Sequence, residues 1–354
     1  MKVLIVKTSS LGDIIQAFSA LDYLKHRVPE MEVHWVVENA FAELVRAHPL
    51  IDKVLTIDSK KWRSSPFRKE NLLQARAFRR TLRETFYDLL FDFQGNVKSS
   101  FVVANARAGE KVGFGWKTVP EWPAWIFSHR KINPQSGRNI REDYLALAQG
   151  YFQDSARYTP SPIALKLDSL QQQKLADLFA SCHKQGIRPT LVCPSAAWSN
   201  KCLSEEGLTR VLQRINKGPY WFVWGSPAER ELAIRLSAHF PASSVLERLS
   251  LPLLQHVMAS SGLVVAMDSL PLHLCGTTQT PTLSFFGPSS AQKYRPLGGN
   301  HLTVQGECPY GVRFEKRCPQ LRTCETGLCL KSAREIDRIV EAEILAHPEF
   351  HSRG

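Results

Sequence analysis

The first half of the chain alternates short apolar runs with stretches of helical periodicity. The runs KVLIVK, EVHWVVE, KVLTID, DLLFDFQ and KVGFG begin at positions 2, 32, 53, 88 and 111. Between them, the spacing of apolar residues predicts helices over residues 14–26, 40–47, 72–86 and 97–106. Continuous apolar runs separated by helices are typical of a parallel sheet that is covered on both faces.

The alternation is lost over residues 154–188, apart from a polar helix predicted over 169–184, and then begins again. PTLVCPSA, WFVWGSP, LVVAMDS and PTLSFFGPS predict further buried strands, with helices such as 208–216 and 228–239 between them. We therefore predict two βα domains, over residues 1–165 and 188–331, joined by a connector over 166–187. An amphipathic helix and a tail are predicted over 332–354.

The net charge of +12 and the pI near 9.4 indicate an anionic partner, such as nucleic acid, acidic lipid or a phosphorylated substrate. No nucleic-acid-binding motif is present, so nucleic acid is not expected. No apolar run approaches the ~20 residues that span a bilayer, and the N-terminus does not resemble a signal peptide. We therefore expect a cytoplasmic protein, with disorder confined to the ends and the stretch 59–69.

A bare carboxylate stands in KTSSLGD, the segment that follows the first predicted strand. Asp13 opens the next helix, where an acidic residue is a favoured cap, so capping is the plainer interpretation. However, Ser9 and Ser10 are equally good caps, and Gly12 would let the backbone turn sharply. Because ligands collect at the carboxyl ends of parallel strands, Asp13 is also a candidate functional residue.

Two loops of the second half carry candidate anion-binding residues. CPSAAWSNK places Lys201 at the start of a predicted helix, behind Ser195 and Ala196, whose N–H groups are open to a diphosphate. The alternative is that Lys201 is an ordinary solvated lysine on the surface. Glu229, in WGSPAERE, either offsets the dipole of the next helix or binds a ribose diol.

The segment MDSLPLHL places Asp268 and Ser269 directly after an apolar strand, with His273 in the following helix. Backbone N–H groups around Ser269 are suited to a second part of a diphosphate. A lone histidine on an apolar helix is usually a core residue, but the position of His273 beside a strand end favours a function. The sequence contains no GxxxxGK[ST], GxGxxG, GxSxG or HExxH motif.

Five segments together resemble, in order and spacing, the bacterial lipopolysaccharide heptosyltransferases of glycosyltransferase family 9. They are KTSSLGD, FDFQGNVKS, the Lys201 loop, WGSP with Glu229, and MDSLPLHL followed by FFGPS. KTSSLGD with WVVE most resembles the heptosyltransferase I branch. The resemblance covers nearly the whole chain and implies a GT-B fold: two Rossmann-like α/β domains whose parallel sheets face each other across a cleft. The acceptor would bind the N-terminal domain and the nucleotide-sugar the C-terminal domain.

The resemblance also implies the substrates and the role of each site residue. The donor would be ADP-L-glycero-D-manno-heptose and the acceptor the Kdo-lipid A inner core. Asp13 would be the catalytic base, Lys201 the catalytic contact to the diphosphate and Glu229 a nucleoside contact. The implied donor-binding residues are Ser195, Ala196, Lys201, Glu229, Leu249, Asp268, Ser269, Leu270 and His273. The implied acceptor-binding residues are Ser9, Ser10, Gly12, Lys60, Lys61, Arg63, Gln94 and Lys98.

One carboxylate suits the chemistry that the resemblance implies. Glycoside hydrolysis needs a second carboxyl group to protonate the leaving alcohol, but ADP leaves as a stable anion. Asp13 would deprotonate the acceptor hydroxyl, while Lys201 and helix N-termini neutralise the diphosphate without a required cofactor. Attack opposite the leaving group would invert the anomeric centre.

The donor loop departs from the family pattern at Leu270, which stands where an Asp-Thr/Ser-Gly motif has its glycine. Glycine lets backbone approach a phosphate closely, so this change bears on the choice of donor. The alternatives are a family 9 enzyme with another donor, with a protein or outer-sugar acceptor, or a non-catalytic nucleotide-sugar-binding relative. The presence of both Asp13 and Lys201 argues against the last.

Two further features carry predictions of their own. Cys308, Cys318, Cys324 and Cys329 cluster without a CxxC pair, which leaves a structural zinc or iron site, reduced thiols and disulfides open. Basic residues from Lys60 to Arg83, flanked by Trp62, Trp116, Trp122 and Trp125, are either a solvated face or an anionic-membrane contact. We expect peripheral association at the inner face of the inner membrane.

Overall fold

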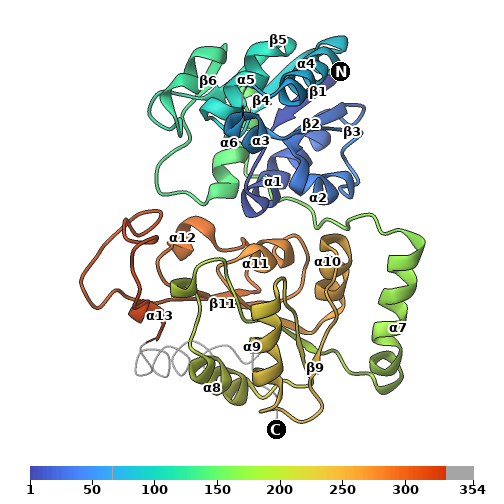
Figure 1. Ribbon diagram of the computed structural model, residues 1–354, viewed down its shortest axis with the longest axis vertical. Helices are drawn as coiled ribbons and strands as arrows, with labels where there is room; N and C mark the ends of the chain where they lie inside the picture. The colour runs from blue at the N-terminus through green and yellow to red at the C-terminus, as the bar shows by residue number, and fades with distance from the viewer. Residues whose placement is uncertain (66, 332–354) are drawn as a thin grey trace. The chain divides into compact units, whose positions relative to one another are not determined.

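Each of the two predicted βα regions folds around a parallel sheet of its own (Figure 1). The structure, a computed structural model, describes residues 1–65 and 67–331. The chain divides into two units, Met1–Lys166 and Leu167–Gly354. The residues predicted as a connector hold helix α7 (Ser169–Gln185), which belongs to the second unit. The helix predicted over 332–354 lies outside the described residues.

The sheet of the first unit has the strand order β3-β2-β1-β4-β5-β6, with every pairing parallel. Its strands are β1 (Lys2–Val6), β2 (Glu32–Glu38), β3 (Lys53–Ile57), β4 (Phe86–Asp92), β5 (Arg107–Phe114) and β6 (Arg130–Ile132). The chain therefore leaves β1 in one direction and, after β3, crosses back to β4 on the other side. The carboxyl ends of β1 and β4 form the point where the order reverses, which is where such sheets bind ligands.

Helices cover both faces of this sheet. They are α1 (Leu11–Arg27), η1 (Asn39–Phe41), α2 (Ala42–Arg46), α3 (Ser59–Ser64), α4 (Lys69–Glu84), α5 (Val97–Asn105), η2 (Trp122–Phe127) and α6 (Ile140–Phe152). Phe18 of α1 contacts Trp35 of β2, while Phe78 of α4 packs in one cluster with the adjacent Val36. Because successive strand side chains point to opposite faces, α1 and α4 lie on opposite sides of the sheet. Helix α6 packs on α1, and α5 lies between α4 and η2.

The second unit repeats the same topology, in the order β12-β11-β10-β7-β8-β9. Its strands are β7 (Thr190–Cys193), β8 (Tyr220–Phe222), β9 (Ser244–Val245), β10 (Leu263–Met267), β11 (Thr282–Phe286) and β12 (His301–Gln305). Besides α7, its helices are η3 (Ser199–Lys201), α8 (Glu205–Ile215), α9 (Pro227–Ser237), α10 (Leu251–Ser260), α11 (Leu270–Cys275), α12 (Ala291–Tyr294) and α13 (Leu328–Lys331). The order reverses at β7 and β10, so the Lys201 and Asp268 loops follow the two central strands.

Several predicted boundaries differ from the structure. Phe86, the predicted end of a helix, is the first residue of β4, and Ser59–Ser64, where disorder was allowed, forms α3. Helix α6 and the short strands β6, β9 and β12 were not predicted. The missed α6 has a capping box in which Asn139 and Glu142 hydrogen-bond the backbone N–H of Arg141 and Asn139, respectively.

Candidate active site

Asp13 occupies the first turn of α1, directly after the loop that leaves β1. Its Oδ2 accepts hydrogen bonds from the backbone N–H of Ser10 at 3.0 Å and from the Ser10 hydroxyl at 2.7 Å. Ser10 is the N-cap residue of α1, so the two residues form a capping box. The carboxylate is half-buried, at the positive end of the helix dipole. Gly12 is helical and has no positive φ, so the expectation that it makes a sharp turn is wrong.

Gln94 holds the residues before this capping box. Its Oε1 accepts from the backbone N–H of Thr8 and of Ser9, both at 3.1 Å, and from the Thr8 hydroxyl at 3.3 Å. Lys98 donates to the Ser9 hydroxyl at 3.3 Å and forms an ion pair with Glu38 at 3.0 Å. Segments after β1, β2 and β4 therefore meet in one polar network at the point where the strand order reverses.

Asp92 holds the Gln94 loop in place through hydrogen bonds. This buried carboxylate accepts from the N–H groups of Gln94 and Gly95 and from the hydroxyl of Ser99, at 2.9–3.0 Å. Burial raises the pKa of Asp92 to about 6, although these hydrogen bonds and nearby Lys7 act in the opposite direction. Gly95 has a φ of +65°, and a Cβ there would lie 2.7 Å from Pro120, so the loop requires glycine.

Apart from Lys98, the predicted basic acceptor-binding residues lie on α3 rather than in this network. The carboxylate of Glu38 accepts from the backbone N–H and the hydroxyl of Ser59, which holds the first residue of α3 beside the network. Further along α3, the side chains of Lys60, Lys61 and Arg63 are exposed. Glu38 thereby joins the basic helix to Lys98 and Ser9.

In the second unit, one buried carboxylate pairs with two basic side chains. Lys201 Nζ lies 2.5 Å from Asp268 Oδ2, and His273 Nε2 lies 3.6 Å from Asp268 Oδ1. Burial alone would raise the pKa of Asp268, but the charges of Lys201 and His273 and the hydrogen bond from Lys201 outweigh it and lower that pKa. Lys201 and Asp268 follow β7 and β10 and His273 lies in α11, so the structure brings together three of the predicted donor-binding residues.

Glu229 forms hydrogen bonds with the turn that leads into α9. Its Oε2 accepts from the backbone N–H of Gly225 at 2.7 Å, and its own N–H donates to the N-cap Ser226 at 3.4 Å. No contact of its Oε1 is found among the described residues, so one oxygen stays available for a hydroxyl group. Leu249 is half-buried in the segment before α10.

Three details of the donor loops differ from the sequence predictions. Lys201 ends the single turn η3 and does not start a longer helix, because α8 begins after its own N-cap, Ser204. The N–H of Ala196 is not open, since it donates to the Cys202 sulfur at 3.2 Å. Leu270 is the first residue of α11 and has no positive φ, so its backbone conformation does not require glycine. What leucine adds there is a half-buried side chain beside Ser269.

A family model described as "Glycosyltransferase family 9 (heptosyltransferase)" matches residues 75–323, which is more than half of the chain. The chain belongs to glycosyltransferase family 9. Lipopolysaccharide heptosyltransferase 1 of Pseudomonas aeruginosa is 30% identical to this family 9 enzyme, over 95% of this chain and 92% of its own. The protein of the same name from Salmonella typhimurium is 29% identical, over 85% of this chain and 93% of its own. The predicted family and its heptosyltransferase I branch are therefore confirmed.

Solved structures confirm the fold class of this family 9 glycosyltransferase. The E. coli heptosyltransferase WaaC with ADP matches with a TM-score of 0.77 and 24% identity, over 97% of this chain and 100% of its own. WaaC with ADP-2-deoxy-2-fluoro heptose matches with a TM-score of 0.75 and 25% identity, over 97% and 99%. The two six-stranded parallel sheets with flanking helices are thus those of a GT-B glycosyltransferase.

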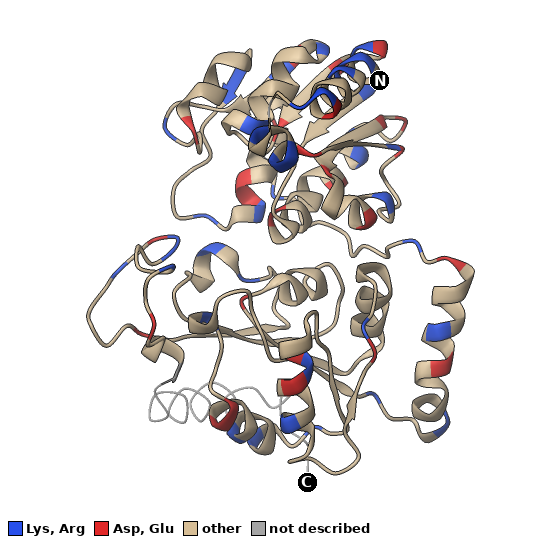
Figure 2. Ribbon diagram, in the orientation of Figure 1, with Lys and Arg blue, Asp and Glu red and all other residues tan. Residues whose placement is uncertain are grey.

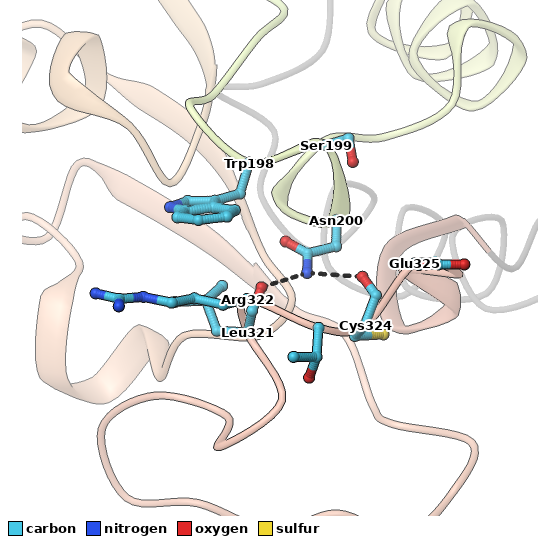
Figure 3. A pocket seen from close by; sticks show the side chains of 8 residues that line it. Trp198, Ser199, Asn200, Leu321, Arg322, Cys324 and Glu325 are labelled. Atoms are coloured by element: carbon cyan, nitrogen blue, oxygen red, sulfur yellow. Dashed lines mark hydrogen bonds between the residues drawn. The ribbon is translucent and has the colours of Figure 1, made fainter.

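Sequence reasoning missed a pocket of about 440 Å³ beside the Lys201 turn of the family 9 enzyme (Figure 3). Figure 3 shows the side chain of Trp198 above that of Arg322, while Asn200 points toward Leu321 and Cys324. Asn200 is buried, and its Nδ2 donates to the carbonyl oxygens of Leu321 at 2.8 Å and Cys324 at 3.1 Å. Asn200 therefore fastens the cysteine-rich segment to the turn that carries Lys201.

The four clustered cysteines line one small cavity of about 20 Å³, together with Phe314 and other residues. Burial and the three other cysteines raise the pKa of the Cys329 thiol to about 11, which favours neutral thiols. Among residues 1–65 and 67–331, none of the four forms a disulfide, and no group of three or more His, Cys, Asp or Glu is arranged to hold a metal. The zinc or iron site predicted at Cys308, Cys318, Cys324 and Cys329 is therefore unsupported.

Proposed function

We propose that this glycosyltransferase moves heptose from ADP-L-glycero-D-manno-heptose to a hydroxyl of the Kdo-lipid A inner core, with inversion at the anomeric carbon. The observation that carries the proposal is buried Asp268 with Lys201 and His273 on its two oxygens, at the reversal point of the second sheet. Support also comes from relatives named lipopolysaccharide heptosyltransferase 1 that match along most of this chain.

The proposed reaction needs one base and one anion-stabilising group. The acceptor oxygen forms a bond to the anomeric carbon while the bond from that carbon to the diphosphate oxygen breaks, and ADP leaves with the electron pair. Asp13 takes the proton of the acceptor hydroxyl. The Ser10 donors and the positive end of α1 favour the ionised carboxylate, the form that a base requires. A general base is typically worth roughly 10²–10⁴-fold in rate.

Lys201 is proposed to stabilise the departing diphosphate. Its ammonium group forms an ion pair with Asp268, which keeps a cation ready in a mostly buried site. A diphosphate oxygen would share that cation with Asp268, and His273 would add a second donor when protonated. Fixed charges in a site of low polarity stabilise a developing anion without reorganisation during the reaction.

Leu270 favours a second candidate, a family 9 transferase that uses a different nucleotide-sugar. Its half-buried side chain stands at the start of α11, next to Ser269 in the predicted donor loop. A leucine there narrows the space beside the diphosphate and sugar compared with glycine. Turnover of other ADP- and nucleotide-sugars at a higher kcat/KM than ADP-heptose would support this second candidate.

We also propose that the enzyme works at the cytoplasmic face of the inner membrane, because the proposed acceptor is a lipid. Among the residues that the structure describes, no helix is long and apolar enough to cross a bilayer. The proposed attachment is therefore peripheral and electrostatic, consistent with the net charge of +12.

The proposed function is tested by ADP-heptose turnover on Kdo-lipid A with Asp13→Asn beside the wild type. Asparagine keeps an oxygen that accepts from Ser10 but is not a base, so we expect the melting temperature to hold. We expect kcat/KM to fall by roughly 10²–10⁴-fold. Glu43→Gln, an exposed carboxylate in the first turn of α2, is the matched control and should change neither quantity. The anomeric configuration of the product is read by NMR.

Two results would overturn the proposal. If the wild type does not turn over ADP-heptose on Kdo-lipid A, the proposed acceptor or the proposed donor is wrong. Asp13→Asn activity within about twofold of wild type would remove Asp13 as the base, since a lost general base costs roughly 10²-fold or more.

A further inference from the structure

The exposed apolar side chains of the first unit lie almost entirely in one part of it. Apart from Met1, the large apolar side chains that are 40–90% exposed all fall between residues 67 and 126. They are Phe67, Leu72, Leu73, Phe86, Val97, Phe101, Trp116, Trp122 and Ile126. The opposite face of the sheet, covered by α1, α2 and α6, presents none among the described residues. Such an uneven distribution marks an interaction surface.

The same part of the unit carries most of its excess positive charge. Residues 59–83 contain nine Lys or Arg and a single acidic residue, Glu70. Figure 2 shows these cations along α3 and α4. Helix α4 has one exposed side and one buried side. The exposed side carries, at helical spacing, Leu72, Arg76, Arg79, Arg80 and Arg83. Phe78 and Leu82 are buried on the other side.

Most of these cations form no ion pair within the part of the chain that the structure describes. No ion pair is found for Lys60, Lys61, Arg63, Arg68, Lys69, Arg76 or Arg79 among the described residues, whereas Arg80 pairs with Glu84 at 3.7 Å. Unpaired like charges close together repel, so the arrangement is unfavourable in the isolated unit. An anionic partner would relieve that repulsion.

Aromatic contacts join the basic and apolar elements into one surface. Trp62 of α3 lies 6.0 Å from Phe78 of α4 and 6.2 Å from Phe101 of α5, measured between ring centroids. Helix α5 packs on η2, where Trp125 contacts Trp116 at 5.9 Å and carries the Lys131 ammonium 4.1 Å above its ring. We call the exposed side chains of α3, α4, α5 and η2, together with Phe67 between α3 and α4, the basic-apolar surface.

We propose that the basic-apolar surface docks this enzyme on an anionic lipid bilayer. Tryptophan and Lys or Arg are the side chains that anchor proteins at the boundary between headgroups and acyl chains. The arginine stripe of α4 would contact lipid phosphates, while Phe67, Leu72, Leu73 and Trp122 enter the interface. A second copy of the chain is disfavoured because two surfaces of the same positive charge would meet. Nucleic acid is the competing occupant, because the exposed Phe and Trp rings could also stack on bases. The exposed Leu, Val and Ile side chains favour acyl chains instead, and the test below includes duplex DNA.

The use of this surface rests on the proposed function, in which the acceptor is a lipid. The surface adjoins the predicted acceptor residues, because α3 is held at its first residue by Glu38, which also pairs with Lys98. A docked enzyme would meet its membrane-embedded acceptor by diffusion along the bilayer. Loss of docking should therefore raise KM for the membrane acceptor and leave kcat unchanged.

The test is cosedimentation with vesicles of phosphatidylethanolamine and phosphatidylglycerol, against phosphatidylcholine vesicles, with no acceptor present. The charge variant is Arg76→Gln/Arg79→Gln/Arg80→Gln, and its control is Arg46→Gln/Arg157→Gln/Lys184→Gln, which removes three exposed cations elsewhere. One basic residue near an anionic surface is worth about fivefold in partitioning, so we expect the charge variant to bind at least about tenfold more weakly. The control should bind as the wild type does.

The apolar contribution is tested by Leu72→Gln/Leu73→Gln/Trp122→Gln at 0.5 M salt, where screening suppresses the charge effect. We expect this variant to be released while part of the wild type is still retained. Both variants should turn over a deacylated, water-soluble acceptor at the wild-type rate. That measurement separates the two proposals, since an enzyme inactive on any Kdo acceptor can still bind vesicles as described.

Three outcomes would overturn the docking surface. The first is wild-type protein that anionic vesicles fail to retain at low salt. The second is equal loss of binding in the charge variant and its control, which would make net charge the cause. The third is full retention of the apolar variant together with displacement of the wild type by duplex DNA, which would identify a general polyanion site.

Discussion

Gln94 is the side chain on which the loop before Asp13 depends most. A single oxygen accepts the N–H groups of Thr8 and Ser9 and the hydroxyl of Thr8, all within 3.3 Å. We predict that Gln94→Met, which has nearly the same length but no acceptor, both destabilises the first unit and displaces the Asp13 loop. The role of Gln94 would then be to position the base, and not only to contact the acceptor.

The size of the effect follows from the three lost hydrogen bonds. Each contributes about 1 kcal/mol net, and a buried N–H left without an acceptor costs about 1–3 kcal/mol. Thr8 is fully buried, whereas Ser9 is only half-buried and water can replace part of the loss. We therefore expect the free energy of unfolding to fall by about 2–4 kcal/mol. A displacement near 1 Å costs roughly 10²-fold in kcat.

The assay is urea unfolding together with kcat and KM for the acceptor, with Gln94→Glu as the matched variant. Glutamate keeps an acceptor oxygen at the same distance from the backbone, so it should recover most of the stability. A purely contacting role predicts a rise in acceptor KM with unchanged unfolding. If Gln94→Met unfolds within about 0.5 kcal/mol of the wild type, the positioning argument is refuted.

The remaining predictions concern three separate groups. The folded pKa of Asp92, about 6, exceeds the unfolded value near 3.9, so its contribution to stability is full below pH ~4 and lost as the pH rises through about 6. Unfolding from pH 4 to 7 should show a decline of about 2 kcal/mol in the wild type that Asp92→Asn lacks. Asn200→Leu removes the bonds to the carbonyls of Leu321 and Cys324, so Cys324 should react faster with a thiol reagent, whereas Ser199→Ala should not change that rate. Leu270→Gly opens space in the donor loop, and calorimetry should find tighter ADP binding; unchanged affinity would exclude contact between Leu270 and the diphosphate.

The sheets were predictable because buried parallel strands leave a strong signal. EVHWVVE and KVLTID match β2 and β3 within one residue, since their apolar runs end at charged or turn residues. Short edge strands such as β6 and β9 carry no comparable run, because three or fewer residues show no periodicity. Helix α6 was predictable from its Asn139–Glu142 capping box, a signal that the apolar pattern alone does not contain.

The site was predictable to the extent that strand topology determines it. Lys201, Asp268 and His273 could be grouped because β7 and β10 are neighbours in a doubly wound sheet. The partners of the loops were not predictable, because they depend on side-chain direction across long sequence separations. Gln94 reaches Thr8 across 86 residues, and Asn200 reaches Leu321 across 121. The sequence shows that Gln94 and Asn200 are present, but it does not show with which backbone groups they form hydrogen bonds.

The two interpretations of Asp13, helix cap and base, do not compete. In the proposed reaction, the base must be ionised, held in one place and able to keep its charge beside a lipid acceptor with phosphates and carboxylates. The capping box provides the first two conditions, because Ser10 donates twice to Oδ2 and the first turn of α1 favours negative charge. Under the proposed function, the capping box would hold Asp13 in place as the base, so Ser10→Ala should reduce kcat more than it raises KM.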